Sequence, residues 1–92
     1  MKVDYNKAAS DLILFYHSSF GGKMKGRYKI KREHLSSILK NIFLKNNQIE
    51  ELRYSLLDRG FILIDLDIEF IIMTVVTFNN YRSVPKKLIG GE

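Results

Sequence analysis

A glycine-centred junction between a helical pattern and an apolar run decides the fold. Residues 48–78 read QIEELRYSLLDRGFILIDLDIEFIIMTVVTF. The part before Gly60 carries one apolar stripe at three- and four-residue spacing: Ile49, Leu52, Leu56 and Leu57. This spacing predicts a helix over residues 48–59. Gly60 is well placed as its left-handed C-terminal cap, so the helix ends there.

The run after Gly60 is rich in β-branched and aromatic residues, which are typical of strands. We expect two antiparallel strands, at residues 61–65 and 68–78, joined by the acidic turn Asp65-Leu66-Asp67. The alternative is one buried helix over residues 67–82, which would make the chain mostly α. A membrane span is not expected, because each acid at mid-bilayer costs roughly 2.5–3.5 kcal/mol.

The residues before this junction predict two further helices and a short strand within a single domain, residues 1–92. A helix over residues 4–20 is indicated by the spacing of Tyr5, Ala8, Ala9, Leu12, Ile13, Tyr16 and Phe20. Residues 27–31 alternate polar and apolar, as a short edge strand does. A second helix over residues 32–45 is indicated by Leu35, Ile38, Leu39, Ile42 and Phe43. The expected fold class is therefore α+β.

The order helix, strand, helix, turn, helix and hairpin resembles that of winged-helix proteins. Residues 51–62, ELRYSLLDRGFI, resemble the point where the third helix of such regulators ends at glycine and enters the wing strand. The resemblance covers residues 27–78. It implies three helices with a small antiparallel β-hairpin, and a DNA-binding regulator or accessory factor. In winged helices the third helix usually enters the major groove.

The basic charge of the chain is concentrated in one segment. Of 15 basic residues, six lie in residues 21–32, which contain no acid, and the rest of the chain holds nine basic and ten acidic residues. Such a patch is typical of proteins that bind phosphates. We therefore expect nucleic acid as the ligand, bound by Lys23, Lys25, Arg27, Lys29, Lys31 and Arg32, with Tyr28 between them.

The predicted third helix offers little for base recognition. Its outward face would carry Glu51 and Asp58 and no basic residue. We expect light base readout at most, through Asn47, Gln48 and Ser55. Further phosphate contacts are expected from Lys45, Arg82, Lys86 and Lys87. The acidic face also fits an alternative, a protein–protein interaction module or adaptor without nucleic-acid binding.

No catalytic or metal-binding pattern emerges, so we expect neither an enzyme nor a cofactor. The chain has no cysteine, and its two histidines, His17 and His34, lack the spacing of a zinc site. Asp65, Asp67 and Glu69 alternate, which suits a solvated turn better than a Mg²⁺ site. Arg53 falls on the inward face of its helix. We expect it either to extend to the rim or to pair with Asp65 or Asp67.

The remaining expectations concern assembly and setting. Leu14, Phe15, Leu44 and several apolar residues after Gly60 exceed what so small a core can bury, which predicts a homodimer. The first apolar run, residues 12–16, is too short for a secretory signal. We expect a soluble cytoplasmic protein that does not bind membranes. The DNA-binding hypothesis implies a role in transcription regulation, and the richness in Lys, Ile and Asn suggests a mobile genetic element with an AT-rich genome.

Overall fold

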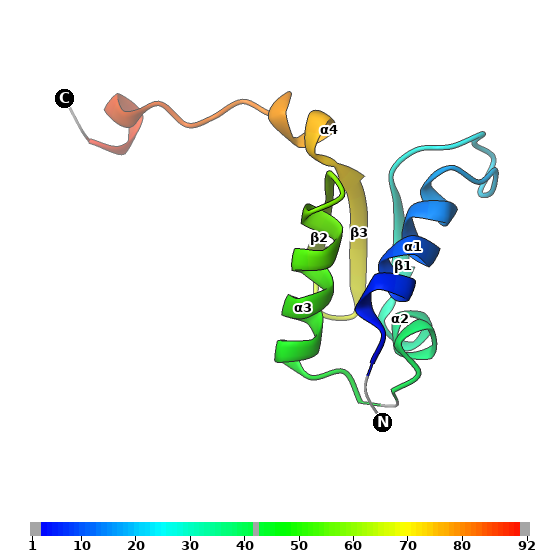
Figure 1. Cartoon of the computed structure of the whole chain (residues 1–92). Helices are drawn as coiled ribbons and strands as arrows, with labels where there is room; N and C mark the ends of the chain where they lie inside the picture. The colour runs from blue at the N-terminus through cyan, green and yellow to red at the C-terminus, as the bar shows by residue number, and fades with distance from the viewer. Residues whose placement is uncertain (1–2, 42, 91–92) are drawn as a thin grey trace.

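The chain folds into an α+β domain with an antiparallel sheet. The computed structural model describes residues 3–41 and 43–90. Figure 1 shows the arrangement of its elements. In chain order these are α1 (Tyr5–Tyr16), β1 (Tyr28–Lys31), α2 (Arg32–Leu39), α3 (Asn46–Leu57), β2 (Phe61–Asp65), β3 (Glu69–Thr74), α4 (Val75–Asn79) and the 3-10 helix η1 (Lys86–Ile89).

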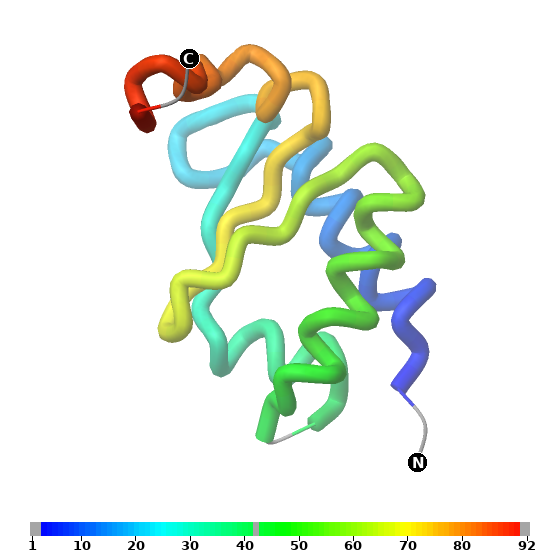
Figure 2. The backbone as a smooth tube through the Cα atoms, turned by 90° about the vertical axis from the view of Figure 1, so that its left-hand side faces the viewer, coloured from blue at the N-terminus to red at the C-terminus, as the bar shows by residue number. Residues whose placement is uncertain are grey.

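The three strands form one sheet with β3 in the centre, in the order β1-β3-β2. Both neighbours run antiparallel to β3. Leu63 of β2 and Tyr28 of β1 are both paired with Ile72 of β3, so these three residues share one face of the sheet. In Figure 2, α1 and α3 lie on the same side of the strands. The sheet thus has an inner face toward the helices and an outer face away from them.

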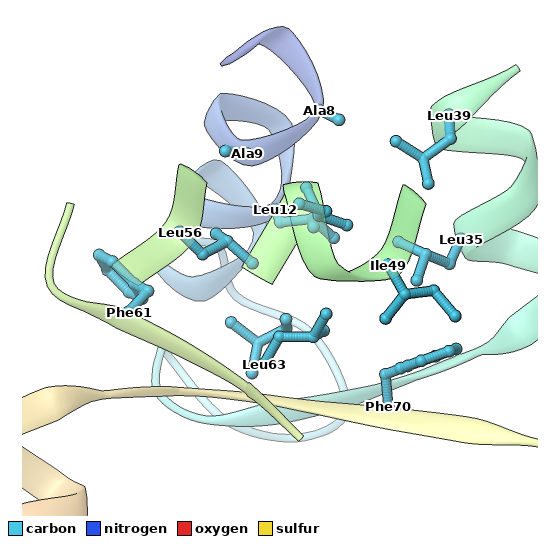
Figure 3. Packing of buried hydrophobic residues seen from close by; sticks show 12 residues of the cluster. Ala8, Ala9, Leu12, Leu35, Leu39, Ile49, Leu56, Phe61, Leu63 and Phe70 are labelled. Carbon is cyan, nitrogen blue, oxygen red and sulfur yellow. The ribbon is translucent and has the colours of Figure 1, made fainter. Parts of the chain in front are cut away.

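The core lies between the inner face of the sheet and the helices. Figure 3 shows how Leu12, Leu35 and Ile49, from three different helices, point toward Leu63 and Phe70 of the sheet. The buried cluster consists of Ala8, Ala9, Leu12, Leu35, Leu39, Ile49, Leu52, Leu56, Phe61, Leu63, Phe70 and Ile72. One element alone cannot bury its apolar stripe, so the helices depend on the sheet for their stability.

The hairpin predicted after Gly60 is confirmed, but its second strand is shorter than predicted. Gly60 has a positive φ of 83°, as predicted, but it lies in the turn after the C-cap residue Asp58, where its N–H donates to Leu57 O. The second strand ends at Thr74 instead of residue 78, because the Thr74 side chain accepts a hydrogen bond from the Thr77 N–H and begins α4. The alternative helix over residues 67–82 is wrong, since β3 occupies most of its first half.

The first two helices end earlier than predicted. α1 stops at Tyr16, and the Ser18 hydroxyl donates to Leu14 O in place of a continued helical bond. α2 stops at Leu39, because Lys40 adopts the left-handed conformation with φ 55°. Phe43 is exposed instead of lying on an apolar stripe, and Ile42 lies outside the described residues. The predicted third helix exists but occupies Asn46–Leu57, two residues earlier than expected.

After α4 the chain leaves the domain. Residues 81–90 are all exposed, and Figure 1 shows them running away from the helices and the sheet. We call this segment the C-terminal arm. The hydrogen bonds of residues 84–90 are local, from Leu88 N to Pro85 O and from Gly90 N to Lys87 O. In the described part of the chain, no helix has both the length and the apolar character needed to cross a membrane.

Candidate nucleic-acid interface

The connection between α1 and β1 is an ordered loop that carries basic side chains. Phe20 and Lys23 exchange two backbone hydrogen bonds of 3.0 and 3.1 Å around Gly21 and Gly22. Both glycines have positive φ, 60° and 81°, as a two-residue hairpin turn requires. A third bond of 2.9 Å, from Gly26 N to Tyr16 O, closes the loop at its base. These closures hold residues 23–25 outward from the domain.

The loop and strand β1 carry five exposed basic side chains. We define the basic loop surface as Lys23, Lys25, Arg27, Lys29 and Lys31, all of which are exposed. The register of β1 with β3 places Lys29 opposite Ile71 and Lys31 opposite Glu69, which puts both lysines on the outer face of the sheet. Lys29 Nζ lies 3.7 Å from Glu69 Oε2. Lys23, Lys25, Arg27 and Lys31 form no ion pair within residues 3–41 and 43–90.

Arg32 has a different role from the neighbouring basic residues. Its Nη1 donates to Asp67 O at 2.9 Å and its Nη2 donates to Leu44 O at 3.2 Å. The guanidinium also lies 5.7 Å from the centre of the Phe70 ring. Arg32 therefore joins the start of α2 to the β2–β3 turn and to the loop before α3. Arg32 was predicted to contact phosphate, but two of its guanidinium nitrogens donate to backbone carbonyls within the domain.

Tyr28 is likewise engaged within the domain. Its hydroxyl donates to Leu12 O at 2.6 Å, and its ring meets Phe15 and Phe20 edge-on. Burial raises the pKa of the Tyr28 hydroxyl well above its usual value, so the phenol stays neutral and keeps donating. This aromatic cluster orients β1 against α1. The ring is therefore fixed by packing, which does not suit stacking on a base.

The polar residues of α3 that were predicted to read bases mostly bond within the protein. Gln48 Oε1 accepts from Lys45 N at 3.0 Å and from Asn41 Nδ2 at 2.7 Å, which fixes the turn before α3. Ser55 Oγ lies 3.2 Å from Asn6 Oδ1, on the side of α3 that faces α1. Asn47 is exposed at the start of the helix. Of these side chains, Asn47 is the one placed at an open surface.

The outward face of α3 is acidic and partly apolar. Arg53 does not pair with Asp65 or Asp67; instead it donates to both oxygens of Glu50, at 3.1 and 2.7 Å, and lies 4.8 Å from the centre of the Tyr54 ring. The hydrogen bond from Arg53 lowers the pKa of Glu50. Glu51, Tyr54, Leu57 and Asp58 are exposed around this pair. We call Glu50, Glu51, Tyr54, Leu57 and Asp58 the α3 face.

The other predicted phosphate contacts lie away from the basic loop surface. In Figure 1 the loop between α1 and β1 lies at the upper right, whereas the C-terminal arm with Arg82, Lys86 and Lys87 extends to the upper left. Lys45 directly precedes α3, whose first turn lies at the bottom of the same view. The predicted phosphate contacts therefore lie in three separate places: on the basic loop surface, at Lys45 before α3, and on the C-terminal arm.

The titratable residues considered for metal binding are dispersed. Among the described residues, no group of three His, Cys, Asp or Glu side chains is placed to hold a metal ion. Asp65 Oδ1 accepts from the Asp67 N–H at 2.7 Å, which stabilises the β2–β3 turn. The ring of His17 lies edge-on against Tyr16 and near Phe61. Asp65 thus takes part in the β2–β3 turn, and His17 takes part in an aromatic cluster.

The sequence predicted that several apolar residues after Gly60 exceed what the core can bury, but it did not locate them on the outer face of the sheet. Beside Lys29 and Lys31 of β1, this face carries Ile62 and Ile64 of β2 and Ile71 and Met73 of β3, which the register pairs across β2 and β3. Met73 is buried but lies outside the main core cluster. The sequence does contain a signal for an apolar outer face. Both strands have an unbroken apolar run, which is typical of strands that are covered on two faces.

Comparison of the chain with sequence profiles of protein families, with curated protein sequences and with solved structures finds no match in any of the three.

Proposed function

We propose that this chain is a winged-helix-like, non-enzymatic nucleic-acid-binding protein that holds the phosphate backbone through the basic loop surface. The element order α1-β1-α2-α3-β2-β3 supports the winged-helix assignment, as does the hairpin that follows the helix-turn-helix unit of α2 and α3. The expected ligand is duplex DNA, and the expected role is that of a regulator or accessory factor.

The observation that carries the proposal is the separation of charge. Exposed basic side chains gather on an ordered loop and the adjoining strand, where the ion pair of Lys29 with Glu69 is the only one within residues 3–41 and 43–90 that involves them. Lys and Arg on such a surface displace the counterions of a nucleic acid, which supplies most non-specific affinity. The closures around Gly21, Gly22 and Gly26 reduce the ordering that binding would otherwise require.

The proposed mode differs from major-groove reading by the third helix. Placing the α3 face in a groove would bring Glu50, Glu51 and Asp58 toward phosphates, and like charges repel each other. The β2–β3 turn, the wing of the proposed fold, carries Asp65 and Asp67 and is also acidic. Because phosphate contacts carry no sequence information, binding through the basic loop surface should depend little on base sequence.

A substitution experiment tests the proposal. Lys23, Lys25, Arg27 and Lys29 are replaced together by Ala, and binding to labelled duplex and single-stranded oligonucleotides of unrelated sequence is followed by fluorescence anisotropy. A comparison variant replaces the three basic residues of the arm, Arg82, Lys86 and Lys87, which are also exposed. We expect the loop variant to lose at least tenfold in affinity for every sequence, and the arm variant to lose much less. Equal affinity of the loop variant and the unchanged protein would refute the assignment.

A second candidate function rests on the α3 face. Tyr54 is held by its contact with Arg53, and Leu57 is exposed beside it, which makes an acidic surface with an apolar centre. Such a surface fits a basic protein partner better than a nucleic acid. In that case, replacing Tyr54 and Leu57 by Ala would abolish partner binding, whereas the loop substitutions would have little effect.

A further inference from the structure

The outer face of the sheet is apolar on its β2 side, whereas its β1 side carries Lys29 and Lys31, with Glu69 beside them. Apart from the short α4 at its end, no other described element covers the apolar side. Ile62 pairs with Met73, and Ile64 pairs with Ile71, so the four side chains form two adjacent rows. α4 contacts the adjoining strands β2 and β3. Ile62, Ile64 and Ile71 are partly exposed, and Leu66 and Ile68 extend the apolar surface into the β2–β3 turn. Antiparallel sheets that face water on one side normally carry polar residues there.

The C-terminal arm has the complementary character. Its apolar side chains, Tyr81, Val84, Leu88 and Ile89, are mostly exposed, as are Val76 and Phe78 of α4 at its root. Within the described residues, no hydrogen bond or ion pair joins residues 82–90 to the rest of the domain. A segment this apolar gains stability only when another surface covers it.

We propose that the arm of one copy packs along the outer face of the sheet of a second copy, which gives a two-fold dimer with exchanged arms. In this dimer the two α4 helices meet near the axis, so that Val76 and Phe78 of both copies cover each other. Each arm then runs from the α4 end of the partner's sheet toward its β2–β3 turn. The same patch serves both copies, as an isologous interface requires.

The length of the arm fits this path. From Tyr81 to Lys86, an extended chain spans about 20 Å, while the five residues of β2 span about 17 Å. Lys86 and Lys87 would therefore arrive at the β2–β3 turn of the partner. Asp65 and Asp67 lie there, and the Asp67 side chain is 92% exposed. The charges of the arm and of the turn are thus complementary.

The available area is sufficient for a dimer. Half-exposed aromatic rings contribute about 100 Å² each, and largely exposed aliphatic side chains contribute roughly 60 Å² each. The arm, α4, the turn and the outer face then bury about 600 Å² of apolar surface per copy, or about 1,200 Å² in all, which reaches the range of stable interfaces. A fold-back of the arm onto its own sheet would leave Val76 and Phe78 uncovered, which favours exchange between copies.

Molar mass in solution tests the proposal. Light scattering on the full chain should give twice the chain mass of 10.8 kDa at tens of micromolar. Replacing Leu88 and Ile89, which are 76% and 74% exposed, by Glu should yield the monomer without unfolding it. The control is Met24→Glu, an apolar residue that is 81% exposed in the loop between α1 and β1 and should stay dimeric. A monomeric unchanged chain, a dimeric arm variant or a monomeric Met24 variant would each overturn the proposal.

Disulfide trapping separates exchange between copies from fold-back within one chain. The chain has no cysteine, so single substitutions report without interference. Leu88→Cys protein mixed with Ile64→Cys protein should form a disulfide-linked heterodimer under mild oxidation. If instead the mixture stays unlinked while the chain with both substitutions closes its disulfide internally, the arm folds back on its own sheet and the exchanged dimer is wrong.

Discussion

Replacing Arg32 with alanine should destabilise the domain far more than replacing the adjacent Lys31. The Arg32 guanidinium donates to two backbone carbonyls, Asp67 O at 2.9 Å and Leu44 O at 3.2 Å, and lies against the Phe70 ring. Each carbonyl belongs to a different loop. The substitution therefore removes the link between the β2–β3 turn and the segment that leads into α3.

The magnitude follows from these contacts. Hydrogen bonds that involve a charged group contribute about 1.5–3 kcal/mol each when buried. The Arg32 side chain is 32% exposed, which reduces their value, and the pair with Asp67 at 3.8 Å adds less than about 1 kcal/mol. We expect a loss of roughly 2–3 kcal/mol in the free energy of unfolding. For a domain of this size, that corresponds to a fall in Tm of roughly 10–20 °C.

Thermal and urea unfolding, followed by circular dichroism, measure this effect. Lys31→Ala is the matched control, because Lys31 is exposed and forms no side-chain hydrogen bond or ion pair with another described residue. Arg32→Lys should recover only part of the stability, since an ammonium cannot reach both carbonyls in a fixed fork. Equal Tm values for the Arg32→Ala and Lys31→Ala variants would refute the structural role of Arg32.

Three further predictions concern single sites. Tyr28→Phe should cost about 1 kcal/mol by removing the bond to Leu12 O. Because burial raises the pKa of Tyr28, its contribution to stability is complete below about pH 10, the unfolded value, and declines as the pH rises above it. Raising the pH from 8 to 10.5 should therefore lower the urea midpoint more in the unchanged protein than in Tyr28→Phe. Equal decreases in the two proteins would contradict this. Gly60→Ala should lower the free energy of unfolding by about 1 kcal/mol. The cause is the positive φ alone, since no atom lies within 4 Å of the added Cβ. An unchanged urea midpoint would show that alanine adopts this conformation without strain. Glu51→Ala and Asp58→Ala should leave nucleic-acid affinity unchanged or raise it slightly in anisotropy titrations, whereas a decrease in affinity would place α3 in the interface.

The features predictable from the sequence are those that local chemistry determines. Gly60 marks a conformation that other residues adopt only with strain, and the change of apolar spacing on either side of it separates α3 from β2. The hairpin followed from the same signals. The end of α2 gave no such signal, because Lys40 takes the left-handed conformation without being glycine.

Two other differences have physical causes that residue types alone do not reveal. The sequence VVTFN favours a strand by composition, yet the Thr74 hydroxyl caps it as helix α4. Arg32 belongs to the basic segment by charge, but its donors are used by carbonyls that lie 12 and 35 residues away along the chain. The number of charges along the sequence locates a basic segment. Only the tertiary structure distinguishes Arg32, which donates hydrogen bonds within the domain, from the exposed lysines of the same segment.

The salt dependence of binding tests the proposed phosphate-binding role most directly. The logarithm of the association constant for duplex DNA is measured against the logarithm of salt concentration for the unchanged chain and for the variant lacking Lys23, Lys25, Arg27 and Lys29. If these residues neutralise phosphates, the slope of the variant should be shallower by roughly 3–4 units, at about 0.9 for each phosphate that is no longer neutralised. A slope identical in the two proteins would contradict a phosphate-binding role for the basic loop surface.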